Sequence, residues 1–126
     1  MVRIVADENM RRLFGPNWRE ILFRLRHEYR YQIEELPVYM RGASDNHIVD
    51  FIISNGYDGI ITEDTDFFET HRSNLLWRLI NSNKIVLVVR RVNPTMRRGE
   101  VRIYRYAKDF TGKARKEEIT RLVIDY

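Results

Sequence analysis

The chain has 126 residues, of which 44% are hydrophobic, which suits one domain with one core and argues against disorder. It contains no cysteine, which excludes disulfides, thiolate metal sites and a cysteine nucleophile, and fits a reducing compartment. No apolar run reaches the roughly 20 residues that cross a bilayer, and the first residues lack a signal-peptide pattern. We therefore expect a cytoplasmic protein without a membrane partner.

The net charge of +4 is distributed unevenly. Residues 1–83 carry 10 Lys/Arg and 13 Asp/Glu, a net charge of −3, whereas residues 84–126 carry 12 and 5, a net charge of +7. An acidic site beside a basic surface suits a polyanion that is held and then cut with the help of metal ions. Arginine-rich surfaces also keep proteins in solution, so charge favours a nucleic-acid substrate without requiring one.

The first half of the chain alternates strand-like and helix-like patterns. Strands are expected where apolar residues run continuously, and helices where they recur every three to four residues. The elements expected here are a strand at 2–6, a turn at 10–14, a helix at 17–30, a strand at 31–36 and a loop at 36–44.

The same alternation continues to residue 90. Ser44 is a suitable N-cap for a second helix over 45–55, and Gly56 a suitable stop. This order of strands and helices predicts a parallel sheet. The later elements are a strand at 57–62, helical segments at 66–70 and 74–82, and a strand at 84–90.

The pattern weakens after Asn93-Pro94. A strand over 101–106 and a helix over 113–126 with a strand-like end are the expectations there. We predict one domain over residues 1–126, with a motif-bearing core of about 1–90 and a basic C-terminal extension over 91–126.

Acidic clusters follow two of the strands and open one helix. Each aspartate also has a structural interpretation as a helix cap, except Asp64, whose charge lies between two other carboxylates. If the first and third strands are neighbours, their ends converge at one edge of the sheet, where oxygen ligands suit Mg²⁺ or Mn²⁺. The clusters are Asp7-Glu8-Asn9, Asp45, and Glu63-Asp64-Thr65-Asp66.

Other kinds of site are less well supported by the sequence. The three histidines are not spaced as zinc ligands, and no phosphate-cradling glycine loop is present. Arginines at or near the presumed active edge are candidates for binding an RNA backbone. These are Arg11, Arg12, Arg41 and Arg90.

Three motifs in order give the chain a resemblance to the PIN-like nuclease family. In that family a first strand ends in Asp-Glu-Asn, a second helix opens Gly-Ala-Ser-Asp, and a third strand ends Thr-x-Asp-x-Asp-Phe. The matching segments are Val5 to Asn9, Gly42 to Ile48, and Ile61 to Phe67.

This resemblance implies a three-layer α/β/α sandwich with a central parallel sheet of four to five strands. It implies Mg²⁺- or Mn²⁺-dependent endonucleolytic hydrolysis of RNA, typical of toxins in toxin–antitoxin pairs, with an antitoxin protein and a homodimer as further partners. By motif, it assigns metal ligands and supporting polar groups. The ligands, which are also the catalytic residues, are Asp7, Asp45, Asp64 and Asp66, and the supporting residues are Asn9 and Thr62.

Two alternatives stay open. Asp64-Thr65-Asp66 also resembles the haloacid-dehalogenase-like phosphatase motif, although it follows the third strand rather than the first. The second alternative is that the chain is a catalytically silent relative of the PIN-like family that binds RNA or a protein.

Overall fold

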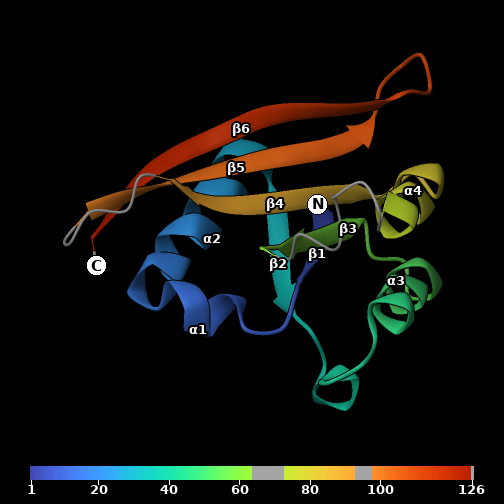
Figure 1. The fold of residues 1–126 in the computed structure, drawn as a ribbon, viewed down its shortest axis with the longest axis horizontal. Helices are drawn as coiled ribbons and strands as arrows, with labels where there is room; N and C mark the ends of the chain where they lie inside the picture. Colours follow the sequence, from blue (N-terminus) through green and yellow to red (C-terminus); the bar gives the residue numbers. More distant parts are fainter. Residues whose placement is uncertain (64–72, 93–97, 126) are drawn as a thin grey trace.

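The computed structural model describes residues 1–63, 73–92 and 98–125, and a six-stranded sheet organises this part of the chain (Figure 1). The strand order is β2-β1-β3-β4-β5-β6. The strands are β1 (Val2–Ala6), β2 (Tyr31–Glu35), β3 (Gly59–Thr62), β4 (Ile85–Val92), β5 (Arg98–Lys108) and β6 (Ala114–Asp125). The helices are α1 (Met10–Phe14), α2 (Pro16–Tyr29), the 3-10 helix η1 (Val38–Met40), α3 (Asp45–Ser54) and α4 (Ser73–Asn81).

The sheet is mixed rather than parallel. Strands β2, β1, β3 and β4 pair in parallel, whereas β4–β5 and β5–β6 pair antiparallel. The antiparallel strands β5 and β6 have 11 and 12 residues and are the longest of the described elements of the sheet (Figure 1). The prediction of a three-layer α/β/α sandwich with a central parallel sheet of four to five strands was therefore wrong.

The error lies in the segment after residue 90, where a helix was expected over 113–126. In β5, Val101 and Ile103 are buried and alternate with more exposed polar residues, which is the period of a strand with one face on the core. A turn joins β5 to β6: the Asp109 carboxylate accepts hydrogen bonds from the backbone N–H of Thr111 (2.8 Å) and Lys113 (3.1 Å). These two strands form a hairpin that continues the sheet beyond β4.

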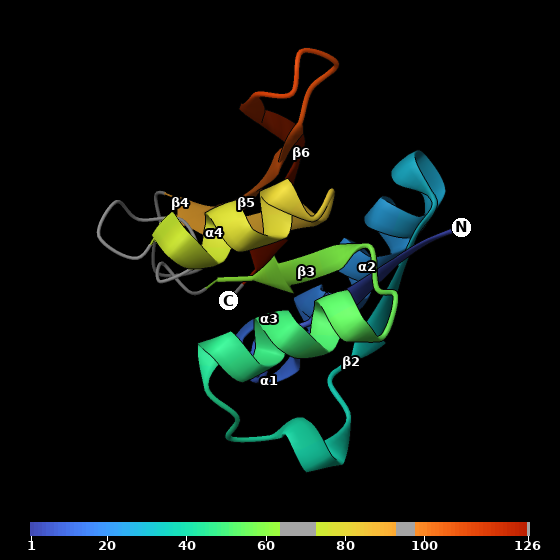
Figure 2. The same cartoon turned by 90° about the vertical axis from the view of Figure 1, so that its right-hand side faces the viewer.

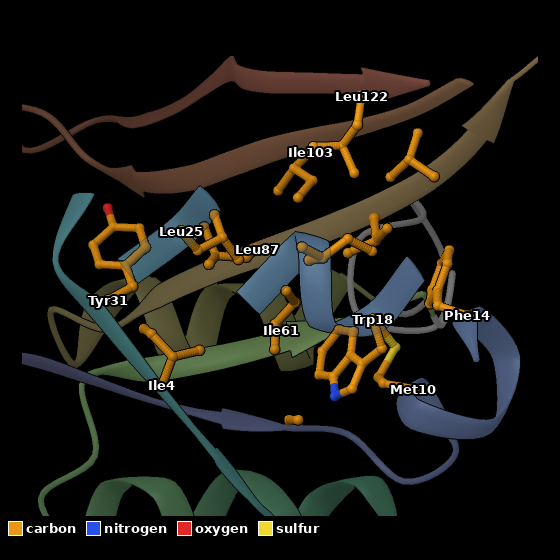
Figure 3. Close-up of a cluster of buried hydrophobic side chains, with 14 residues drawn as sticks. Ile4, Met10, Phe14, Trp18, Leu25, Tyr31, Ile61, Leu87, Ile103 and Leu122 are labelled. Atoms are coloured by element: carbon orange, nitrogen blue, oxygen red, sulfur yellow. The ribbon is translucent and has the colours of Figure 1, made fainter. Parts of the chain in front are cut away.

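Helices α1 and α2 lie against one face of the sheet. Their buried side chains pack with alternate residues of the strands, including Ile61 and Leu87 (Figure 3). The hairpin closes over the same core: Leu122 belongs to this cluster, and the Tyr29 hydroxyl of α2 donates a hydrogen bond to the carbonyl of Ile119. The segment expected as a turn at 10–14 is the helix α1, preceded by Asn9 with a φ of 75°.

Helices α3 and α4 lie side by side on the opposite face (Figure 2). Their apolar residues pack on Val5, Ile60 and Val86, the strand positions that point away from α2. Ser44 caps α3 as predicted, since its Oγ accepts the backbone N–H of His47 at 3.3 Å. This cap fixes the position at which α3 begins. The helical segment expected at 66–70 lies outside the described residues.

Candidate functional site

The ends of β1 and β3 meet beside Asp7, the first residue after β1. The two strands are paired in parallel, and the backbone N–H of Asp7 donates to the carbonyl of Ile61 at 2.9 Å. The Asp7 carboxylate accepts two hydrogen bonds. Oδ2 takes the hydroxyl proton of the fully buried Thr62 at 2.8 Å, and Oδ1 takes the backbone N–H of Glu8 at 2.8 Å. These bonds fix the orientation of the carboxylate.

The segment that leads to Asp45 is bound to the same edge of the sheet. The backbone N–H of Gly42 donates to Glu8 Oε2 at 3.2 Å, which attaches the loop before α3 to the loop after β1. Asp45 is half-buried in the first turn of α3, where the helix dipole favours a carboxylate. The motif at Asp7 and the motif that precedes Asp45 are therefore joined by a direct hydrogen bond.

A pocket of about 390 Å³ opens beside Asp7. Buried apolar side chains, including Met10 and Trp18, lie on its inner side, and charged side chains surround them. Arg11 and Glu35 form an ion pair there, with Nη1 and Oε1 3.2 Å apart. The lining residues are Ala6, Asp7, Glu8, Asn9, Met10, Arg11, Arg12, Trp18, Glu35, Leu36 and Arg41.

Three of the four arginines predicted to bind RNA line this pocket. Arg11, Arg12 and Arg41 are all exposed, so their guanidinium groups can reach a phosphate in solvent. Arg90 does not line it: this residue lies on β4, two strands away from β1 in the sheet. The structure thus separates Arg90 from the other three.

The residue after Thr62 contacts a second part of the site. Glu63 Oε1 accepts a hydrogen bond from Arg91 Nη2 at 3.0 Å, and the Arg91 guanidinium lies 5.5 Å from the Phe14 ring centroid. Glu63 Oε2 is buried and has no hydrogen-bond partner among the described residues. Arg91 stands beside Arg90 at the end of the predicted fourth strand, but its pairing with Glu63, which is 28 positions away, could not be predicted from the sequence.

Only two of the four predicted aspartates, Asp7 and Asp45, belong to the described residues. Asp64 and Asp66 lie outside the described residues, so their convergence with Asp7 stays a prediction. Within the described ranges, no group of three or more His, Asp or Glu side chains is placed to hold a metal ion. Carboxylates such as those of Asp7 and Asp45 are ligands that suit Mg²⁺ or Mn²⁺.

Several arginines of the C-terminal hairpin form ion pairs with glutamates of the same hairpin. Arg102 lies within 3.1 Å of Glu100 and 3.7 Å of Glu118, and Arg105 pairs with Glu117. The hydrogen bond from Arg105 lowers the pKa of the Glu117 carboxyl below its usual range. These ion pairs involve only some of the basic residues, and the net charge of residues 84–126 is still +7.

Comparison of the chain with protein-family models, with curated proteins and with solved structures finds no match. None of the helices in the described part of the chain has the length and apolar character needed to cross a membrane.

Proposed function

We propose that this protein is a metal-dependent endoribonuclease that hydrolyses phosphodiester bonds of RNA. The observation that carries the proposal is the fixed carboxylate of Asp7. It lies where β1 and β3 end, hydrogen-bonded to Thr62, and the neighbouring Glu8 holds the loop that precedes Asp45. Ligands are bound at this carboxyl edge in parallel α/β sheets. Arg12 and Arg41 line the pocket beside Asp7, and their exposed guanidinium groups can contact the phosphates of a polyanion.

Each group has a proposed role. Asp7 and Asp45, together with Asp64 and Asp66 of the segment after β3, would hold Mg²⁺ or Mn²⁺. The ion supplies an activated water and stabilises charge on the phosphodiester oxygens. Thr62 orients Asp7 through its hydroxyl, and Asn9 borders the pocket beside it. Arg12 and Arg41 would bind backbone phosphates, and Arg11, which pairs with Glu35, would contact the bound RNA.

The test is cleavage of a fluorescently labelled single-stranded RNA by the full chain, with Mn²⁺, with Mg²⁺ and with EDTA. We expect cleavage with either metal, none with EDTA, and none after Asp7→Asn, Asp45→Asn or Asp64→Asn. Asp50→Asn is the matched control for Asp45→Asn, because Asp50 is an exposed aspartate on the same helix and pairs with Arg78. Full activity in EDTA, or in both Asp7→Asn and Asp64→Asn, would refute the proposal.

A second candidate is a catalytically silent relative that binds RNA or a protein. The residues 1–63, 73–92 and 98–125 do not by themselves make a three-ligand metal group, because Asp64 and Asp66 lie outside them, so this alternative stays open. Such a protein would bind RNA with strong salt dependence and leave it intact in Mn²⁺. The antitoxin and the homodimer stay predictions of the family resemblance. Co-purification from the native host and the mass of the purified protein in solution test them.

A further inference from the structure

The pocket beside Asp7 has the size and lining of a site for a single nucleobase. Its volume is about 390 Å³, within the usual range for small-ligand sites. The inner side chains Met10 and Trp18 are 2% and 5% exposed and belong to the core beneath α1 and α2 (Figure 3). Leu36, which is 8% exposed, adds a third apolar surface. A base that leaves its stack needs apolar or aromatic surface for its faces and hydrogen-bonding groups for its edge.

The rim provides hydrogen-bonding groups of a particular kind. Arg11 and Glu35 form an ion pair whose side chains are 78% and 63% exposed, so a ligand can reach both groups. Glu8 adds a second carboxylate, whose Oε2 accepts the Gly42 N–H. An ionised carboxylate only accepts hydrogen bonds, whereas a guanidinium only donates them. The rim therefore presents acceptors next to a donor.

Guanine is the base whose edge matches this arrangement. Its N1–H and its exocyclic amino group are adjacent donors that one carboxylate can accept together, and its O6 is an acceptor that an arginine can bind. Uracil has one N–H between two carbonyl oxygens. A carboxylate that accepts this proton lies beside two oxygens that carry partial negative charge and repel it. Adenine and cytosine each pair their amino group with a ring nitrogen that is an acceptor.

We propose that this pocket binds one unstacked guanine of a single-stranded RNA, with Glu35 as the residue that selects it. The inference rests on the proposed nuclease function and names its substrate preference. Asp7 also lines the pocket, so a base held there would lie near the carboxylate that is proposed to bind the metal ion. The cut phosphodiester is then next to the selected guanosine, and Arg12 and Arg41 are placed at the rim for its phosphates.

Binding is measured without metal, so that it does not depend on cleavage. Trp18 and Trp77 are the two tryptophans, and Trp77 is 46% exposed on α4. Trp77→Phe makes Trp18 the sole fluorescent reporter of the pocket. The full-length Trp77→Phe protein in EDTA is titrated with GMP, AMP, CMP and UMP, and with the trinucleotides UGU and UUU. We expect GMP and UGU to change Trp18 fluorescence at concentrations roughly 5- to 150-fold lower than UMP and UUU, the range of one bidentate base contact.

Variants then assign the selectivity to a residue. Glu35→Gln offers one acceptor in place of two and should reduce the guanine preference to about threefold or less. The control is Glu20→Gln, because Glu20 is an exposed glutamate that also pairs with an arginine, Arg24 at 3.4 Å, but lies outside the pocket. It should leave the preference unchanged.

Three results would overturn the inference: no response of Trp18 to any nucleotide, equal affinity for all four, or the same behaviour of Glu35→Gln and Glu20→Gln. Failure of the nuclease proposal gives a different result. In that case guanine binds selectively in EDTA, while RNA stays intact in Mn²⁺. Metal-dependent cleavage without a base preference leaves the nuclease proposal in place and removes the guanine pocket.

Discussion

The hydrogen bond from Thr62 to Asp7 joins the ends of two strands at the candidate site, and its removal tests the site's construction. Thr62→Val keeps the shape of the side chain but removes the hydroxyl that donates to Asp7 Oδ2 at 2.8 Å. Hydrogen bonds to charged groups contribute about 1.5–3 kcal/mol, and Thr62 is fully buried, so water does not replace the lost donor. We expect the free energy of unfolding to fall by about this amount, which lowers the melting temperature by roughly 6–12 °C.

The assay is urea denaturation followed by tryptophan fluorescence, with a double-mutant cycle. In an Asp7→Ala background, Thr62→Val should cost much less, because the acceptor is gone. Thr120→Val is the control, since Thr120 is also a buried threonine but lies on β6. An equal loss with and without the Asp7 carboxylate would show that this bond does not hold the site together.

The remaining predictions concern the frame of the site. In Gly59→Ala the new Cβ would lie 2.0 Å from the carbonyl oxygen of Ile85, so denaturant melts should show a loss of at least about 1–3 kcal/mol. The hydrogen bond from Arg3 lowers the pKa of Glu34, so this pair stabilises the fold above the unfolded pKa of about 4.3, and the stability is lost as pH falls through the lower folded pKa. Acid titration of Glu34→Gln should lack this component. Ser44→Ala removes the cap of α3 and should cost about 0.5–2 kcal/mol in the same melts, and no change would contradict the cap.

The parallel half of the fold could be predicted because β3 and much of β1 and β4 are buried on both faces. Segments such as 59–62 and 85–89 are continuous apolar runs, and the helices between them carry apolar residues at helical spacing. The hairpin gives a weaker pattern because one side of it carries paired charges. Glu118 and Arg121 are three residues apart and pair at 2.9 Å within a strand, a spacing that is also typical of helices. The irregularity between Ile103 and Tyr104 further breaks the two-residue period.

The candidate site was predictable where it follows from strand order. Because β1 and β3 are neighbours, Asp7 and Thr62 had to lie at one edge. The pocket could not be predicted in the same way. Its residues come from β1, the loop after it, α1, α2, the end of β2 and the loop before α3, and Trp18 has in sequence only the features of a core residue. Glu35 ends an ordinary strand, and its partner Arg11 is 24 positions away.

The ion pairs of the arginines bear on which of them would bind RNA. By composition, residues 84–126 carry a net charge of +7 and would be the phosphate-binding surface. In the fold, Arg102 and Arg105 are each paired with a glutamate of the hairpin, so these two guanidinium groups already have a partner. The arginines around the pocket lie beside Asp7, where the proposed nuclease would hold the phosphodiester. Removal of Arg12 and Arg41 should therefore weaken RNA binding and lower its salt dependence by about one counterion each, whereas removal of Arg102 should not. Equal effects of the three changes would place the RNA on the hairpin and separate it from the site at Asp7.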